Sequence, residues 1–199
     1  MTMAVLIAGL ILFLGMHSTR IVAEGWHTQM IGRLGEGAWK GLYSIVSLAG
    51  FALLIWGYGL ARQQPVVLWT PPTGTRHVAA LLMVFSFILL AATYVPRNAI
   101  KSSLHHPMVL AVKIWALAHL LANGTLADVV LFGAFLLWAV MSFRAARQRD
   151  RAAKTVYPPG TVSATVVTTL IGLAAWAAFT FWGHVWLIGV PPFGVRPLG

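Results

Sequence analysis

Long apolar runs separated by short polar stretches dominate the chain. The runs cover about residues 3–21, 39–60, 77–95, 106–122, 126–143 and 162–190. The first five are close to the roughly 20 residues that an α-helix needs to cross a bilayer, and helices satisfy their own backbone hydrogen bonds there. The sixth is long enough to span with tilt or to extend past the bilayer. The pattern therefore predicts an all-α fold, a polytopic transmembrane bundle of about six helices that forms a single domain over residues 1–199.

Turn-forming and charged residues mark the connections. Pro96 ends the third run, and Asn123-Gly124 is a turn signal that makes the fourth and fifth runs a tight hairpin. We expect loops around Glu24 to Glu36, from Arg62 to Arg76, and along the basic run from Arg144 to Lys154, which ends the fifth helix at residue 143.

Glycines in the second run indicate close helix packing. Gly50 and Gly57 lie seven residues apart, with Gly59 close by. Small residues at such spacing let two helix backbones approach each other in a membrane. We expect a neighbouring helix to pack on this face.

Composition places the protein in a lipid bilayer. Hydrophobic residues make up 59% of the chain and charged residues 9%, against about 25% charged residues in a soluble domain. The net charge of +10 comes from basic residues between the apolar runs, where they meet anionic lipid, so we do not expect nucleic acid as a partner. The chain has no cysteine, which excludes disulfides, thiolate metal sites and cysteine nucleophiles.

The distribution of Lys and Arg predicts the orientation. Ten of the 14 fall in the first, third and fifth connections, three in the other connections and the C-terminus, and one, Lys113, inside the fourth run. Because basic loops stay on the cytoplasmic side, both termini are expected on the opposite face.

Histidines are the candidate site residues. His106 and His119 are 13 residues apart, or about 20 Å along a helix, and face different sides, so both need partners from other helices. The predicted depths form two layers. One layer contains His17, His105 and His106 near the cytoplasm, and the other contains His77, His119 and His184 near the outer face.

Imidazoles in membrane helices without thiols suit the axial ligation of haem iron. The alternative is a hydrogen-bonded or interfacial histidine with a structural role. Zinc is disfavoured because closely spaced ligand sets are missing and no acid lies near His119. Arg20, Arg97 and Lys101 lie where haem propionates could be paired, with lipid headgroup anchoring as the alternative.

Lys113 lies two helical turns beyond His106 on nearly the same face. It could snorkel to the interface, pair with Glu36, or hold an anionic ligand. We count it among the candidate cofactor-binding residues.

Four long motifs resemble the NnrU family of bacterial membrane proteins. They are GLILFLGMHSTR at residues 9–20, GEGAWKGLYSIVSLAGFALLIWGYGLAR at 35–62, LWTPP with Arg76-His77, and HPMVLAVKIWALAHLLANGTLADVVLFG at 106–133. This resemblance implies a multi-pass protein of the bacterial inner membrane linked to nitrite and nitric oxide metabolism in denitrification. Together with the Lys and Arg distribution, it makes both termini periplasmic in our prediction. A nitric oxide reducing system is the implied membrane partner.

The motifs are also similar to those of 15-cis-zeta-carotene isomerases, which bind haem b and isomerise a carotenoid in a redox-dependent way. Their HSG histidine matches His17-Ser18, and their LAH histidine matches His119, so this resemblance implies His17 and His119 as the haem ligands. Two positions depart from that pattern: Thr19 follows the HS pair, and Ala116 replaces a cysteine. Because the predicted depths group His17 with His106, His106 is the substitute ligand.

Other functions compete with a haem-dependent isomerase acting on an apolar small molecule. One is a non-enzymatic scaffold or a sensor of nitric oxide or redox state. Another is methyl transfer, because His106-Pro107 is reminiscent of the RHPxYxG stretch of isoprenylcysteine carboxyl methyltransferases, which bind S-adenosylmethionine. Here residue 105 is His, residue 109 is Val, and Asp150 is the one acid in the following basic run.

Overall fold

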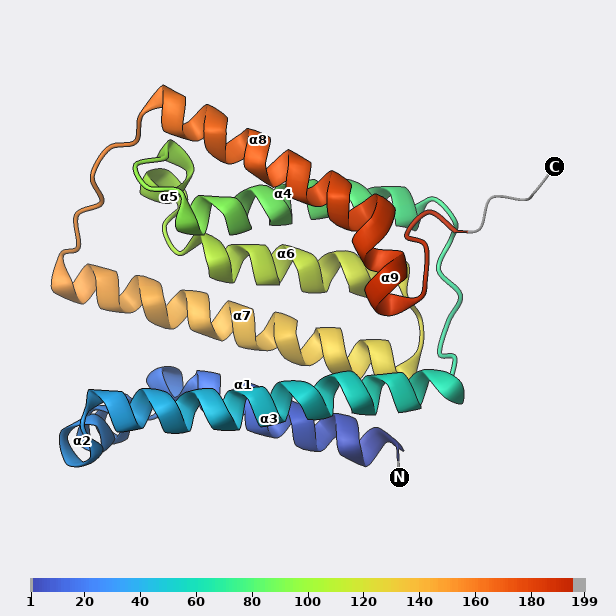
Figure 1. Cartoon of the computed structure of the whole chain (residues 1–199), viewed down its shortest axis with the longest axis horizontal. Coiled ribbons are helices and arrows are strands. Elements are labelled where there is room, and N and C mark those ends of the chain that lie inside the picture. Colours follow the sequence, from blue (N-terminus) through green and yellow to red (C-terminus); the bar gives the residue numbers. More distant parts are fainter. Residues whose placement is uncertain (1, 195–199) are drawn as a thin grey trace. The chain divides into compact units, whose positions relative to one another are not determined.

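The computed structural model describes residues 2–194 and is all-α, as predicted. Its elements are α1 (Thr2–Val22), α2 (Glu24–Leu34), α3 (Glu36–Gln63), α4 (Thr75–Tyr94), α5 (Ala99–Leu104), α6 (Pro107–Ala122), α7 (Leu126–Ala153), α8 (Val162–Ala178), the π-helical turn η1 (Phe179–Gly183) and α9 (His184–Ile188) (Figure 1). The helices that the apolar runs predict are all present.

Five helical segments within the described residues are long and apolar enough to cross a membrane. These are α1, α3, α4, α7 and the continuous stretch Val162–Ile188. The remaining apolar helix, α6, has 16 residues, or about 24 Å of rise. It is therefore shorter than the roughly 30 Å hydrocarbon core of a bilayer.

Three connections that we expected to be loops are partly helical. The polar stretch after α1 forms the 11-residue α2, and the connection after Pro96 contains the short α5. The fifth helix continues past residue 143 to Ala153. Its basic end consists largely of Arg, Ala and Gln, which are strong helix formers, so the run is charged without breaking the helix.

The chain divides into two compact units, each described here by itself. The first contains Met1–Thr70 and Gly124–Ala145, and the second contains Pro71–Asn123 and Ala146–Gly199. Helix α7 supplies residues to both units. The expectation that the chain forms one membrane domain stays a prediction.

In the first unit, α1 packs closely along α3 because glycines line the contact. A Cβ on Gly9 would lie 2.6 Å from the backbone nitrogen of Leu54, and one on Gly50 would lie 2.7 Å from that of Phe13. A Cβ on Gly57 would lie equally close to the backbone of Leu6, whereas Gly59 has no atom within 4 Å of the position its Cβ would take. The predicted close approach is therefore confirmed for Gly50 and Gly57, and Gly59 takes no part in it.

In the second unit, α4 packs against both α6 and α8 (Figure 1). The buried Ser86 hydroxyl of α4 donates a 2.9 Å hydrogen bond to the carbonyl oxygen of Ala111 in α6. On the side of α8, a Cβ on Gly172 would lie 2.5 Å from Cα of Ile88. Small and hydroxyl residues thus take the place of a hydrophobic driving force between helices, which lipid does not supply.

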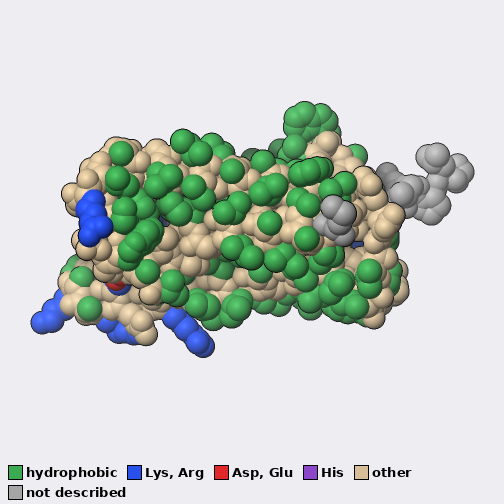
Figure 2. Space-filling model, turned by 90° about the horizontal axis from the view of Figure 1, so that it is seen from below, with side chains coloured by type: hydrophobic (Ala, Val, Ile, Leu, Met, Phe, Trp, Pro, Cys, Tyr) green, Lys and Arg blue, Asp and Glu red, His purple; other side chains and the backbone are tan. Residues whose placement is uncertain are grey.

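Much of the surface is apolar. Figure 2 shows one face covered largely by hydrophobic side chains, with the visible Lys and Arg side chains gathered at its left side. Ile45 and Trp56 of α3 are 68% and 60% exposed, and Trp186 of α9 is 83% exposed. Such exposure suits side chains that face lipid.

Candidate functional site

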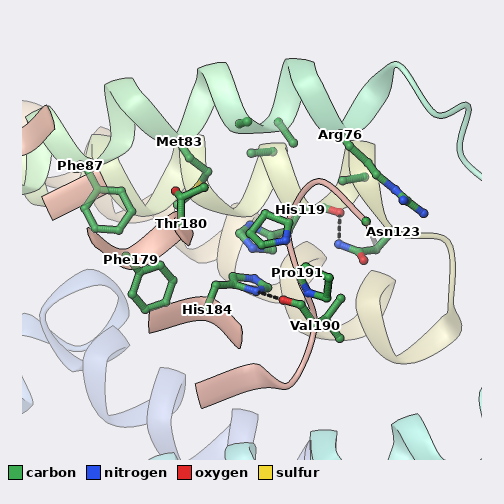
Figure 3. Close-up of a pocket in the computed structure, with 16 residues that line it drawn as sticks. Arg76, Met83, Phe87, His119, Asn123, Phe179, Thr180, His184, Val190 and Pro191 are labelled. Carbon is green, nitrogen blue, oxygen red and sulfur yellow. Dashed lines mark hydrogen bonds between the residues drawn. The ribbon is translucent and has the colours of Figure 1, made fainter. Parts of the chain in front are cut away.

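A cavity of about 380 Å³ lies in the second unit (Figure 3). Residues of α4, α6, η1, α9 and the segment after α9 line it. The alanines of α4 and α6 have side chains too small to fill the space, and the rings of Phe87 and Phe179 form part of the wall. Its polar residues are Arg76, His119, Asn123, Thr180 and His184. An apolar cavity with a few polar groups, at the small end of the roughly 300–1,000 Å³ range, is typical of small-molecule and cofactor sites.

His119 enters this cavity in a defined tautomer. It lies in the last turn of α6, and its Nδ1 donates a 2.8 Å hydrogen bond to the carbonyl oxygen of Trp115, one turn earlier. Because Nδ1 carries the proton, the lone pair of the neutral ring is on Nε2. A backbone carbonyl that fixes the ring in this way is the usual second partner of a metal-binding histidine.

His184 is the second imidazole that lines the cavity, and its tautomer is fixed in the same way. Its Nδ1 donates a 2.6 Å hydrogen bond to the carbonyl oxygen of Val190. The chain can return to make this contact because Gly189 has a φ of 75°, which glycine adopts without steric cost. The structure therefore brings together His119 and His184, two of the three histidines expected in the outer layer.

The π-helical turn η1 sets the direction of His184. The backbone N–H of His184 donates to the carbonyl oxygen of Phe179, five residues earlier. This bond accommodates one residue more than an α-helical turn, so the residues after it lie on a different face of the helix. Phe179 and Thr180 of the same turn also line the cavity.

His77, the third histidine of that predicted layer, does not line the cavity. Its ring stacks on Phe193 with a centroid distance of 6.0 Å. His77 is thus a nearby histidine with a packing contact of its own, and it serves as a control for substitutions of the cavity histidines.

His17 lies in the first unit within a group of aromatic rings. Its ring stacks on Phe13 at 4.2 Å and lies 5.2 Å from Tyr43 and 6.1 Å from Trp138. Nδ1 donates a 2.7 Å hydrogen bond to the carbonyl oxygen of Phe13. The pattern matches His119 with Trp115, so both residues of the ligand pair implied by the resemblance present Nε2 as the acceptor nitrogen. Nε1 of Trp138 is buried and has no hydrogen-bond partner among the described residues.

These observations fit the binding of haem through histidine. The two histidines have fixed tautomers with the lone pair on Nε2, and the cavity beside His119 has apolar and aromatic walls of the kind a porphyrin contacts. The groups that could bind the haem iron also fit, because the chain has histidines and no cysteine. His17 belongs to the first unit and His119 to the second, so their pairing on one iron stays a prediction.

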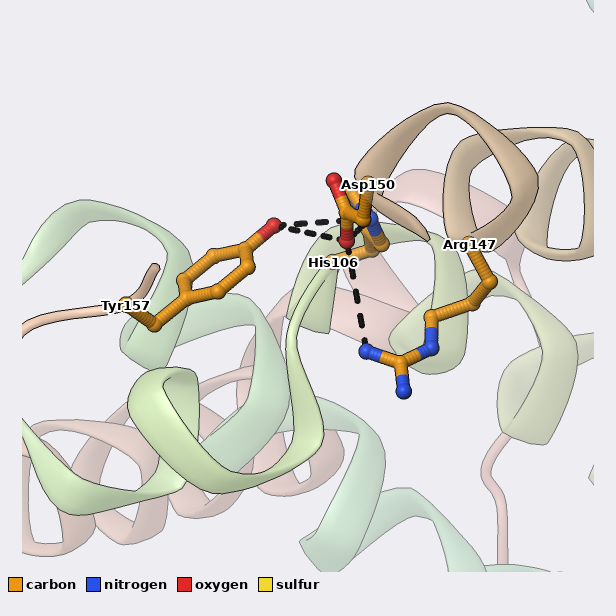
Figure 4. Close-up of polar contacts among 4 residues, drawn as sticks. All are labelled: His106, Arg147, Asp150 and Tyr157. Atoms are coloured by element: carbon orange, nitrogen blue, oxygen red, sulfur yellow. Dashed lines mark hydrogen bonds and ion pairs between the residues drawn. The ribbon is translucent and has the colours of Figure 1, made fainter. Parts of the chain in front are cut away.

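His106, the substitute ligand, lies in a polar cluster in the second unit (Figure 4). Its Nε2 is 2.8 Å from Oδ2 of Asp150, and the Tyr157 hydroxyl donates to the same oxygen at 3.1 Å. Arg147 Nη1 lies 3.9 Å from that oxygen. To bind iron through Nε2, His106 would have to leave Asp150.

The backbone at this cluster is strained. His105 and His106 have φ angles of 56° and 35°, which place two non-glycine residues in the left-handed region. The His105 ring stacks on Tyr157 with a centroid distance of 3.9 Å. Pro107 begins α6 immediately afterwards, at the first helical position, which proline favours.

Two of the three basic residues proposed for propionates have local side-chain partners. Arg20 pairs with Glu24 at 3.9 Å. Lys101 Nζ donates to the carbonyl oxygen of Thr93 at 3.1 Å. Arg97 has a φ of 57° and lies beyond the C-terminal end of α4.

Lys113 lies in the middle of α6 and is half-buried. Glu36, one of the partners considered for it, forms a 2.7 Å ion pair with Lys40.

Sequence reasoning did not single out two cavity residues, Arg76 and His184, as ligand-binding groups. Arg76 was read as part of a loop, although it lies in the first turn of α4. The predicted depths group His184 with His119, and the structure brings both to one cavity, but the position of His184 depends on a π-helical turn that no periodicity reveals. The sequence feature that could have identified Arg76 is its position one helical turn before Ala79 and Ala80, whose small side chains line the cavity.

The fold and the cavity together define an all-α membrane protein, with five described helical segments long and apolar enough to cross a bilayer and an apolar cavity that two histidines line. Residues 5–192 match the model of the NnrU protein family, which covers nearly the whole chain, and the protein belongs to that family. Neither the curated proteins nor the solved structures contain a significant match to this chain.

Proposed function

We propose that this protein binds haem b in the membrane, with His119 as one axial ligand. The observation that carries the proposal is the fixed Nδ1–H tautomer of His119 at the wall of an apolar cavity. His17, with the same tautomer in an aromatic surrounding, is the second ligand that the resemblance to the carotene isomerases implies. When bound, haem iron supplies one-electron redox chemistry and a site for diatomic ligands.

An absorption spectrum of the detergent-solubilised protein, with a pyridine haemochrome assay, tests this proposal. We expect a Soret band in the wild-type protein after expression with added haem precursor. His119→Ala and His17→Ala should each shift the band and lower the haem content. His106→Ala should leave the spectrum unchanged, because Asp150 holds its Nε2.

His27→Ala is the matched control, since His27 lies in α2 with its ring against Trp39. A wild-type protein that takes up no haem, even when haem is added after purification, would contradict the proposal. Unchanged spectra in both the His17 and His119 variants would contradict the ligand assignment.

We infer from the resemblance a role in nitric oxide metabolism, as a redox-dependent isomerase or as a sensor or scaffold without catalysis. If haem is bound, it would supply the redox chemistry of the isomerase or the ligand-binding group of the sensor. Adding nitric oxide to dithionite-reduced protein should shift the Soret band. Conversion of an added carotenoid would favour the isomerase, and a spectral response without conversion would favour the sensor.

Methyl transfer has one supporting contact, because the histidine of the His-Pro pair meets the acid of the following basic run. That contact engages the carboxylate oxygen with His106, Tyr157 and Arg147. Binding of S-adenosylmethionine by the purified protein, measured by calorimetry, would favour methyl transfer over haem binding.

We also infer that both termini lie on the periplasmic side of the bacterial inner membrane, as the Lys and Arg distribution implies. The chain has no cysteine, so single cysteines report the topology directly. A membrane-impermeant maleimide should label Thr73→Cys in spheroplasts and Thr155→Cys only after lysis. Thr73 and Thr155 are both exposed, and the reverse labelling pattern would overturn the orientation.

A further inference from the structure

Arg76 is the charged residue that shares a cavity with His119. It lies at the rim, one turn before Ala79 and Ala80 of the cavity wall, and its side chain is exposed (Figure 3). A Cβ on Gly194 would lie 2.7 Å from Arg76 Nη1. The guanidinium therefore lies beside Gly194, which also lines the cavity.

No Asp or Glu side chain, all four of which lie among the described residues, serves as its counter-ion. The sequence contains four acidic residues, and each has partners elsewhere. Glu24 pairs with Arg20, Glu36 with Lys40, and Asp150 with His106 and Arg147. Asp128 accepts from Tyr58 and Thr125. A cation at the mouth of an apolar cavity, with the side-chain carboxylates of all four Asp and Glu residues engaged elsewhere, is suited to an acidic group on a bound molecule.

We propose that Arg76 binds a carboxylate of the apolar molecule that occupies the His119 cavity. The proposal rests on the proposed function where that molecule is haem b, whose propionates are such carboxylates. The same chemistry is found in a long-chain fatty acid, and the experiment separates the two.

The geometry also separates Arg76 from the other basic candidates of this unit. Arg76 lies in the first turn of α4, whereas Arg97 and Lys101 follow its last residue, Tyr94. The 20 residues of α4 place the two ends roughly 30 Å apart. His119 lines the cavity at the Arg76 end, and His106, at the start of α6, lies 13 residues from His119. A carboxylate on a molecule that His119 binds is therefore within reach of Arg76, and one near His106 is within reach of Arg97 and Lys101.

The test compares Arg76→Gln with Arg97→Gln in full-length protein reconstituted in nanodiscs. Haem b and haem b dimethyl ester, in which both carboxylates are esterified, are titrated and followed by the Soret band. We expect Arg76→Gln to weaken haem b binding about tenfold, a loss that corresponds to one charge-assisted pair. The dimethyl ester should bind the wild type and Arg76→Gln equally, and Arg97→Gln should bind haem b as the wild type does.

A third titration uses palmitate as the probe. If the wild type binds palmitate and no haem, and Arg76→Gln loses palmitate, the carboxylate site stands and the haem proposal fails. If Arg76→Gln weakens the binding of haem b and of its ester equally, the role of Arg76 is overturned, because a general disturbance of the cavity would weaken both. Unchanged binding of both haem b and palmitate in Arg76→Gln would also overturn it and leave lipid headgroup anchoring as the role of Arg76. Arg76→Lys, which keeps the charge without the planar fork, should recover part of the affinity.

Discussion

The Tyr58 hydroxyl donates a 2.5 Å hydrogen bond to Oδ1 of Asp128 and so connects α3 to the first turn of α7. The other oxygen of the carboxylate accepts from the backbone N–H and the hydroxyl of Thr125, at 3.0 and 2.6 Å. In return, the Asp128 N–H donates to the Thr125 hydroxyl at 3.3 Å. This reciprocal arrangement is a capping box, with Asp in place of Glu. Asp128 thus caps the start of α7 and orients the Tyr58 hydroxyl.

Removing the Asp128 carboxylate should therefore destabilise the first unit. Asp128 is 5% exposed, and Asp128→Ala leaves the Tyr58 hydroxyl and the helix N-terminus without their acceptor. We expect a loss of about 2–3 kcal/mol in the free energy of unfolding. Thermal unfolding in detergent measures it. In a double-mutant cycle with Tyr58→Phe, the two effects should be less than additive, and strict additivity would show that the bond does not couple the helices.

The glycine contact between α1 and α3 offers a matched pair of substitutions. Gly57→Ala adds a methyl group within 3 Å of the α1 backbone at Leu6, so the helices must separate. Gly59→Ala adds the same group where no atom lies within 4 Å. We expect Gly57→Ala to lower the unfolding temperature and Gly59→Ala to keep or raise it, since Ala favours helix by about 1 kcal/mol. Equal effects at both positions would indicate that helix propensity, and not packing, determines the result.

The Tyr157 hydroxyl predicts a pH dependence in the alkaline range. Burial first, and then the hydrogen bond to Asp150, raises the pKa of Tyr157 above its ordinary value of 10.0. The folded protein thus favours the neutral phenol, and this stabilisation is complete below about pH 10 and is lost as the pH rises through the higher folded pKa. We expect the unfolding temperature of the wild type to fall more steeply than that of Tyr157→Phe between about pH 9 and about pH 12.

Tyr94→Phe serves as the control for that profile. Tyr94 is 72% exposed, and its substitution should leave the alkaline slope as in the wild type. If the Tyr157→Phe and wild-type profiles are parallel, the hydroxyl does not contribute in the folded state.

Lys113 gives a prediction about cofactor retention. The residue lies within an otherwise apolar helix, where a cation is costly unless it has a function. We expect Lys113→Leu to insert normally and to lose haem during purification, measured as the ratio of Soret to protein absorbance. Lys40→Leu is the comparison, because Lys40 is exposed and pairs with Glu36 on the same helix. Full retention in Lys113→Leu would reject a site role for this lysine.

Sequence patterning was sufficient for the features that depend on one helix or on its lipid surroundings. The apolar runs located every long helix, Pro107 and Asn123-Gly124 marked the boundaries of α6, and Gly50 and Gly57 identified the face that packs on α1. Each of these follows from local chemistry, since bilayer thickness, turn residues and small side chains act within one segment.

What patterning missed depends on contacts that are distant in the sequence or on irregular backbone. The basic stretch after residue 143 has the charge pattern of a solvated loop, but its residues have high helix propensity and continue α7. Asp150 meets His106 and Tyr157 because the chain returns after α7, and no spacing predicts that meeting. The pairing of His119 with His184 in one cavity likewise depends on η1 and on the left-handed Gly189.

The π-helical turn at Phe179–Gly183 gives the last membrane segment an internal surplus of one residue. Removing one residue there would convert the turn to an α-helix, and the part of the segment beyond it would keep nearly its present direction, because the π-turn takes one residue more than the α-turn for about the same rotation. Hydropathy and span length would scarcely register such a deletion, and the imidazole of His184 would stay close to its present position. The turn is therefore the place where this segment can lose one residue and still keep its register.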